Sequence, residues 1–192
     1  FLPNIPESII AMLATASIGA IWSSCSPDFG IKGVLDRFKQ IEPKFLISTN
    51  GYRYNGKVFD LTKKLNGILG DLDSLEQVII IPFVNDISNK SIKNETCYYD
   101  DFINRNIFDS LVFEQLPFDH PLYIMYSSGT TGLPKSIVHS AGGTLIQHLK
   151  ELMLHVDLNR DDSIFYFTTC GWMMWNWLVS SLAIGSTIVL YD

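Results

Sequence analysis

The chain has 192 residues, of which 47% are hydrophobic and 18% charged, a composition that favours a folded protein with a substantial core and excludes a largely disordered one. Its formal net charge is −6 and its basic residues form no cluster, so we expect no nucleic-acid partner. The three cysteines, Cys25, Cys97 and Cys170, are odd in number and far apart, which argues against a disulfide framework or a metal site and favours a reducing compartment.

The two ends of the sequence suggest an internal piece of a longer protein. Phe1 stands where an initiator methionine would be, and Asp192 directly follows a strand-like run. The opening residues also lack the basic region of a cleavable signal peptide. We therefore expect a cytosolic protein with further sequence beyond this chain.

The first predicted element is a helix that begins near Pro6. Asn4 is placed to cap it, proline suits the first turn, and Glu7 follows the cap at the spacing of a capping box. Gly19 is placed to end the helix, because glycine readily adopts the left-handed conformation found there. A short buried strand over residues 20–24 follows.

The next segments alternate between amphipathic helices and short apolar strands. Asp28 is predicted to cap a second helix, which Pro43 ends. A third helix has apolar residues at helical spacing over residues 58–68 and stops at Gly70. The strands predicted beside these helices span residues 45–47 and 78–81. Alternation of helices with buried strands is typical of an α/β fold with a parallel sheet.

The periodic pattern degrades over residues 83–119 and resumes beyond them. The later predicted elements are strands at 122–125, 137–138, 164–168 and 187–191, and helices at 142–153 and 172–183. Residues 163–191 contain no charged side chain, so a membrane-spanning segment is the alternative for this region. The glycines and small polar residues spaced through it favour a strand, a helix and a second strand instead.

The strongest functional signal is the run of small residues at 126–136, YSSGTTGLPKS, which lies between two predicted strands. Glycines let backbone amides approach an anion closely, hydroxyls donate hydrogen bonds, and Lys135 adds a positive charge. These residues predict a loop that binds a phosphate chain, with a solvent-exposed turn as the alternative. The loop does not match G-x-x-x-x-G-K-[ST], because Pro134 occupies the place of the second glycine.

The order S-S-G-T-T-G-x-P-K resembles the phosphate-loop signature of the adenylate-forming enzymes, which include acyl-CoA synthetases and luciferases. Members of that family often carry glycine after the lysine, and Ser136 departs from this pattern. The resemblance implies that the loop holds the phosphates of ATP and that Lys135 acts in catalysis. The phosphate-binding residues that it implies are Ser127, Ser128, Gly129, Thr130, Thr131, Gly132 and Lys135.

Further segments resemble the acetoacetyl-CoA synthetase branch of this family. These segments are residues 3–7, 18–30, 135–143 and 171–177. The resemblance implies a ligase that uses ATP, Mg²⁺ and coenzyme A to convert acetoacetate to acetoacetyl-CoA through an acyl-adenylate. It also implies that residues 1–192 form part of the large N-terminal AMP-binding domain, whereas a small C-terminal lid with its catalytic lysine lies beyond Asp192.

Two other groups of residues acquire a role from the same resemblance. Arg53 and Lys57, in a segment predicted to be a loop between a strand and a helix, correspond to a basic loop that contacts the nucleotide end of coenzyme A. Ordinary solvated charge is the alternative for them. Trp172, Met173 and Met174 would line the acyl pocket and restrict it to a short acid, although aromatic core packing accounts for such clusters equally simply.

The four histidines, His120, His139, His148 and His155, have no partners at catalytic or metal spacing, so we expect neutral structural or surface roles for them. The chain's own residues predict no metal site. Two alternatives to an acetoacetate ligase remain. One is a ligase for acetate or propionate, and the other is a noncatalytic nucleotide-binding relative.

Overall fold

The computed structural model describes residues 1–85, 87, 92, 96–103, 110–127 and 132–191. Its helices are α1 (Pro6–Ser17), α2 (Ile31–Phe38), α3 (Thr62–Leu69), α4 (Tyr99–Ile103), α5 (Ala141–Lys150) and α6 (Met173–Ser180), with a π-helical turn at Glu151–His155 and a 3₁₀ turn at Ser181–Ala183. Its strands are β1 (Trp22–Ser23), β2 (Phe45–Thr49), β3 (Gly51–Tyr54), β4 (Lys57–Asp60), β5 (Gln77–Ile81), β6 (Thr96–Tyr98), β7 (Pro121–Ser127), β8 (Lys135–Ser140), β9 (Ser163–Phe165) and β10 (Thr187–Val189).

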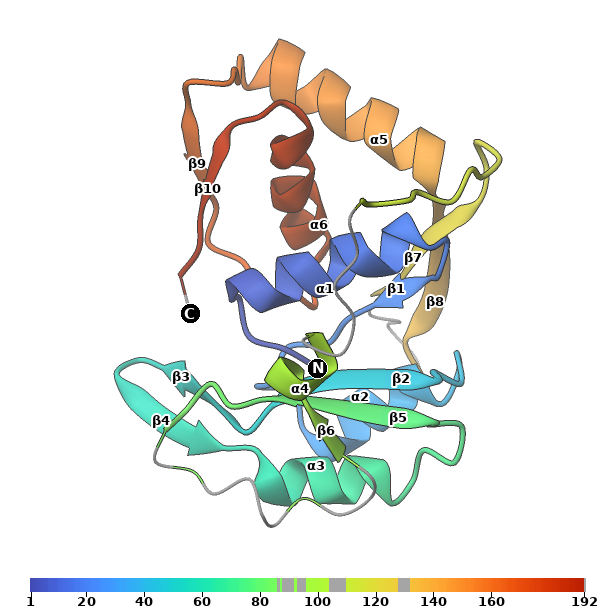
Figure 1. Ribbon diagram of the computed structural model, residues 1–192, viewed down its shortest axis with the longest axis vertical. Coiled ribbons are helices and arrows are strands. Elements are labelled where there is room, and N and C mark those ends of the chain that lie inside the picture. The colour runs from blue at the N-terminus through green and yellow to red at the C-terminus, as the bar shows by residue number, and fades with distance from the viewer. Residues whose placement is uncertain (86, 88–91, 93–95, 104–109, 128–131, 192) are drawn as a thin grey trace.

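A parallel sheet forms the lower half of the molecule in the view of Figure 1. Its strands run in the order β2-β5-β6, with Leu46 opposite Val78 and Ile79 opposite Cys97. A hydrophobic core that includes Val34, Phe38, Leu65 and Ile80 lies between this sheet and the helices α2 and α3. The predicted α/β fold with parallel strands is therefore confirmed.

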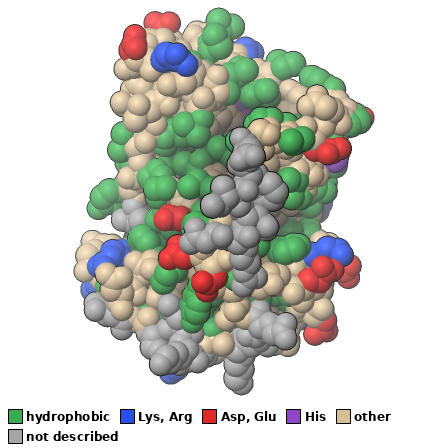
Figure 2. All heavy atoms as spheres, in the orientation of Figure 1, with side chains coloured by type: hydrophobic (Ala, Val, Ile, Leu, Met, Phe, Trp, Pro, Cys, Tyr) green, Lys and Arg blue, Asp and Glu red, His purple; other side chains and the backbone are tan. Residues whose placement is uncertain are grey.

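In the upper half of the molecule a mixed sheet packs against the helices α1 and α6. β1 pairs in parallel with β7, and β7 pairs antiparallel with β8. A second core gathers α1, β7 and α6 around Trp175, which is fully buried. Figure 2 shows hydrophobic side chains on the surface of this half, over α1, α6 and β10. Exposed residues there include Leu13, Val189 and Tyr191.

The end of α1 follows the prediction, but its beginning does not. Gly19 has a φ of +73° and Ala20 donates to the carbonyl of Thr15, which together form the glycine-terminated helix end known as a Schellman motif. Asn4 does not cap the helix. It instead accepts a hydrogen bond from Trp175 and donates one to the carbonyl of Tyr191, so distant partners outcompete the local cap.

The predicted starts of α2 and α3 also differ from the structure. Asp28 makes no cap, because α2 begins at Ile31 after an extended Gly30. The predicted helix over 58–68 begins only at Thr62, since residues 57–60 form β4. β4 pairs with β3 through a turn in which Asn55 and Gly56 both have positive φ, the conformation that an Asn-Gly hairpin favours.

Two further observations complete the comparison with the predicted elements. The region 83–119 contains β6 and α4, which the sequence pattern did not indicate. Between residues 163 and 191 the structure has β9, α6 and β10, as predicted. No helix among the described residues has both the length and the apolar character needed to cross a bilayer.

Candidate functional site

The predicted phosphate loop connects the two strands of a hairpin. β7 ends at Ser127 and β8 begins at Lys135, and these two residues face each other as the last pair of the ladder. Gly132 has a φ of +138°, a backbone conformation that residues other than glycine rarely adopt. The two strands predicted on either side of the loop are confirmed. The other predicted loop residues, Ser128, Gly129, Thr130 and Thr131, lie outside the described residues.

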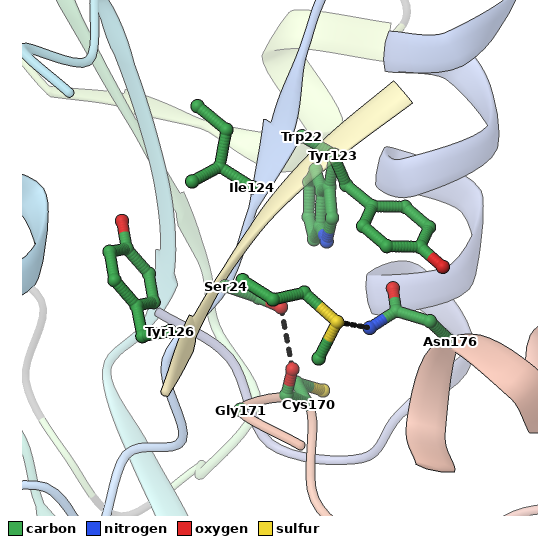
Figure 3. A pocket seen from close by; sticks show the side chains of 9 residues that line it. Trp22, Ser24, Tyr123, Ile124, Tyr126, Cys170, Gly171 and Asn176 are labelled. Atoms are coloured by element: carbon green, nitrogen blue, oxygen red, sulfur yellow. Dashed lines mark hydrogen bonds between the residues drawn. The ribbon is translucent and has the colours of Figure 1, made fainter. Parts of the chain in front are cut away.

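Strand alternation places the last two residue pairs of the hairpin on opposite faces of the sheet. Tyr126 and Ser136 share one face, whereas Ser127 and Lys135 share the other. Figure 3 shows this alternation along β7, with Tyr126 on one side of the strand and Tyr123 on the other, toward Asn176 of α6. Lys135 therefore leaves β8 on the face that also meets α6.

The ammonium group of Lys135 is exposed. Among the described residues it has no hydrogen-bond or ion-pair partner. The side chain of Ser127 is half-buried beside it. A free cation opposite a hydroxyl at the mouth of a glycine-containing loop is an arrangement that can receive an anion.

Tyr126 anchors the other face of the hairpin. Its hydroxyl lies 3.1 Å from the hydroxyl of Ser23. Because Ser23 donates its only proton to the carbonyl of Ile124, the Tyr126 hydroxyl is the donor of this pair. The guanidinium of Arg37 lies 5.7 Å from the Tyr126 ring centroid. Burial of the phenol raises its pKa to about 12, so it remains protonated at neutral pH. Tyr126 therefore supports the loop and carries no charge into it.

Behind β7 lies a small enclosed cavity of about 10 Å³, large enough for a single water molecule (Figure 3). Trp22, Tyr123 and Asn176 line it. Within the described part of the chain, the indole nitrogen of Trp22 and the side-chain oxygen of Asn176 have no hydrogen-bond partner. The other end of the Asn176 amide donates to the sulfur of Met125 at 3.7 Å, which ties α6 to β7.

A larger open groove of about 470 Å³ runs between β8, the first turns of α5 and the beginning of α6. His139, Thr144, His148 and Met173 contribute to its lining. The structure thus brings together one of the three predicted pocket residues and two of the four histidines. The sequence spacing of His139 and His148 did not indicate a shared groove, because their proximity depends on how α5 folds back against β8.

Both histidines in the groove favour their neutral forms. Burial lowers the pKa of His139, and burial also lowers that of His148, with a smaller lowering contribution from His139 and an opposing one from Glu151. His148 Nδ1 lies 2.8 Å from the hydroxyl oxygen of Ser180, and that hydroxyl donates to the carbonyl of Asn176. Ser180 therefore accepts from Nδ1–H, which leaves Nε2 of a neutral His148 as an acceptor.

The strand-to-helix turn before α6 presents its large side chains in different directions. Trp172 is 62% exposed and Met173 47% exposed, Met174 is half-buried, and Trp175 is 0% exposed. Gly171 permits a close approach to the preceding loop, since a Cβ there would lie 3.2 Å from the backbone nitrogen of Ser26. Trp175 thus anchors the turn in the core, whereas Trp172 and Met173 are exposed and Met173 lines the groove.

Arg53 and Lys57 lie on the β3–β4 hairpin rather than in an irregular loop before a helix. The pairing of Arg53 with Val58, and of Tyr54 with Lys57, places the two cations on opposite faces of the hairpin tip. In Figure 1 this hairpin lies at the left edge of the molecule, on the other side from β8. The structure therefore does not bring these two residues together with Lys135.

The described residues contain no group of three or more His, Cys, Asp or Glu side chains that could hold a metal ion. A protein-built cage for Mg²⁺ is thus not among them. Mg²⁺ commonly binds through the phosphates of a nucleotide and retains several water molecules. We therefore assign no metal ligand among the described residues.

Comparison with known proteins gives a consistent result. The chain matches the family model described as AMP-binding enzyme over residues 1–192. It is 56% identical over its full length to an acetoacetyl-coenzyme A synthetase from Rhizobium meliloti (strain 1021) and 54% identical to an acetoacetyl-CoA synthetase from Gallus gallus. It covers 29% and 30% of these two relatives, respectively.

A solved structure gives the same picture in three dimensions. The acetoacetyl-CoA synthetase from Streptomyces lividans superimposes with a TM-score of 0.92 at 49% identity, over 100% of this chain and 29% of that one. The chain thus spans less than a third of the length of these relatives. Since the family model covers every residue, the chain belongs to the AMP-binding enzyme family.

Proposed function

We propose that the protein containing this chain is an ATP-dependent acid–thiol ligase that converts acetoacetate, ATP and coenzyme A to acetoacetyl-CoA, AMP and pyrophosphate. The observation that carries this proposal is the exposed Lys135, which lies opposite Ser127 at the mouth of the loop and has no partner in the described part of the chain. It is supported by the end-to-end match to relatives named acetoacetyl-CoA synthetase.

The proposed reaction has two steps. A carboxylate oxygen of acetoacetate attacks the α-phosphorus of ATP, and the bond from that phosphorus to the pyrophosphate oxygen breaks. The thiol of coenzyme A then attacks the acyl carbon and displaces AMP. In the first step negative charge builds on the leaving pyrophosphate, so a fixed cation beside it stabilises the transition state.

Lys135 supplies that cation in our proposal. Together with Ser127, Gly132 and the loop residues 128–131 it would hold the β- and γ-phosphates. Lys135 stands on the hairpin face that meets α6. Mg²⁺ would neutralise phosphate charge and be carried by the nucleotide.

The groove beside α6 is the proposed site for the acyl end of the substrate. Met173 lines it, and the exposed Trp172 and the half-buried Met174 flank Met173. Bulky side chains at this position would limit the length of the acid that fits. The neutral histidines leave the groove free of positive charge, which suits an uncharged acyl chain.

Arg53 and Lys57 are the proposed contacts for the nucleotide end of coenzyme A. Both are exposed near the tip of the β3–β4 hairpin. Because they lie on opposite faces, we propose that each contacts the nucleotide end separately and that the two do not form a joint clamp. The chain itself would form part of the N-terminal AMP-binding domain of a cytosolic enzyme acting on small molecules.

The test is a substrate panel with the full-length protein. Pyrophosphate release is measured with ATP, Mg²⁺ and coenzyme A in the presence of acetoacetate, acetate or propionate. The proposal predicts the highest kcat/KM with acetoacetate. A preference for acetate or propionate would replace the assigned substrate, and no release with any acid would favour a noncatalytic nucleotide-binding protein.

A further inference from the structure

The segment around Lys135 is held by a side chain that lies far away in the sequence, just beyond the helix α2. Gln40, just after the end of α2, donates a hydrogen bond of 2.8 Å from Nε2 to the carbonyl of Pro134. Its Oε1 accepts a hydrogen bond of 3.0 Å from the hydroxyl of Ser136. A single amide thus binds the residue on each side of Lys135.

The orientation of the Gln40 amide follows from its partners. Nε2 also donates to the carbonyl of Asp36, so both of its hydrogens are used. Carbonyl oxygens only accept, and the amide nitrogen must therefore face the carbonyls of Asp36 and Pro134. The amide oxygen is then left to accept from the hydroxyl of Ser136. Reversing the amide would set oxygen against oxygen at two contacts.

This arrangement fixes the backbone of Lys135 without covering its charge. Ser136 points toward α2, so strand alternation directs Lys135 to the opposite face. Gln40 therefore holds the chain from behind while the ammonium group remains exposed in front.

A second contact of α2 acts on the other strand of the hairpin. Arg37, one helical turn before Gln40, places its guanidinium over the ring of Tyr126, and Nη1 donates to the carbonyl of Gly33 at 2.7 Å. Tyr126 lies directly opposite Ser136 in the ladder. The end of α2 thus contacts both strands at the level of the loop.

We propose that Gln40 is a positioning residue for Lys135, with Ser136 as its dedicated partner. The proposal deepens the proposed function and rests on it for its kinetic consequence. Ser136 stands where related loops often have glycine, and the bond to Gln40 gives its hydroxyl a specific role. Without the brace, the segment must be ordered when the nucleotide binds, and that entropy cost reduces the affinity for ATP.

The kinetic test compares Gln40→Ala, Ser136→Ala and the double variant in the full-length protein. Each single change is expected to raise the KM for ATP by about three- to tenfold, since one or two exposed hydrogen bonds are lost. The KM for acetoacetate and kcat should stay within about twofold of wild type. The double variant should be no worse than Gln40→Ala, because both changes remove one shared interaction.

Two control variants separate positioning from general destabilisation. Lys39→Ala alters the neighbouring side chain, which contacts Asp71 at 3.8 Å rather than the hairpin, and should leave the KM for ATP unchanged. Ser136→Thr keeps the hydroxyl and should restore wild-type kinetics. Additive effects in the double variant, or equal rises in the KM of all substrates, would overturn the proposal.

Hydrogen–deuterium exchange provides a readout that does not depend on activity. A peptide covering residues 133–138 should exchange faster in Gln40→Ala than in Lys39→Ala. If the wild-type protein shows no ATP-dependent activity, the proposed function fails, and the exchange rates still decide whether Gln40 braces the segment. Equal exchange in the two variants would refute the brace, whatever the activity.

Discussion

At the scale of single residues, Lys135 is the side chain whose charge matters most to the proposed chemistry. Lys135→Ala in the full-length protein should lower kcat/KM for ATP about 10- to 150-fold. This corresponds to a loss of ~1.5–3 kcal/mol of transition-state stabilisation, the cost of losing a charge-assisted hydrogen bond. Steady-state kinetics at varied ATP measure this. Lys63→Ala, which removes an exposed lysine on α3, is the matched control. Unchanged ATP kinetics in Lys135→Ala would remove the residue from its proposed role.

His148 makes a prediction about pH and stability. Because burial lowers its pKa in the folded chain below the ordinary value of 6.5, the unfolded chain binds more protons in the window between the two values. Stability therefore decreases as the pH falls below about 6.5 through that window. His148→Asn, which retains a donor toward Ser180, should show a smaller loss of melting temperature between about pH 7.5 and 5.5 than wild type.

Thermal melts followed by circular dichroism provide the measurement for this variant. The dependence should not vanish, because burial also lowers the pKa of His139. Equal slopes for wild type and His148→Asn would contradict the assignment of a neutral, buried His148.

At the scale of elements, the beginning of α6 has two tryptophans with different environments, of which the buried one is structural and the exposed one is proposed to face the substrate. Trp175 is 0% exposed and donates to Asn4 at 2.9 Å, so Trp175→Ala should destabilise the fold by about 3–5 kcal/mol. Trp172 is 62% exposed, and Trp172→Ala should change stability by no more than about 0.5 kcal/mol. Urea denaturation measures both changes, and the KM for acetoacetate should respond to Trp172→Ala. The reverse ranking in stability would contradict this division.

Elements with strong local signals were predictable from the sequence. The strands β2 and β5 follow from apolar runs, and the end of α1 follows from Gly19. The β3–β4 hairpin had a local signal, the Asn55-Gly56 pair, but apolar residues at helical spacing over 58–68 suggested a longer helix. β6 pairs with β5 through only three residues, too short a segment for its pattern to stand out.

The parts of the site that escaped prediction depend on contacts between distant residues. Asparagine is a residue type that commonly caps helices, but the partner of Asn4 is Trp175, which lies 171 residues away. Gln40 is an ordinary surface residue in sequence, and its contact with Pro134 spans 94 residues. Spacing along one element carries no information about such pairs. The loop motif could be found because its residues are consecutive in the sequence.

At the scale of the whole molecule, the β7–β8 hairpin lies between two helices with different tasks. The end of α2 supports one face through Gln40 and Arg37, and α6 meets the other face, where Lys135 is exposed. Lys135 and His139, which lines the groove beside α6, share that face of β8. This arrangement suits a reaction that joins a small acid to a nucleotide phosphate.

Isotope exchange between pyrophosphate and ATP tests that joining reaction most directly. Exchange in the full-length protein is measured without coenzyme A, so that only formation and reversal of the acyl-adenylate contribute. We predict exchange that requires acetoacetate and falls about 10- to 150-fold in Lys135→Ala, in line with one lost charge-assisted contact. Exchange that is absent with acetoacetate, or that proceeds equally well in the Lys135→Ala variant, would contradict the central claim that this loop holds the phosphates of ATP during activation of the acid.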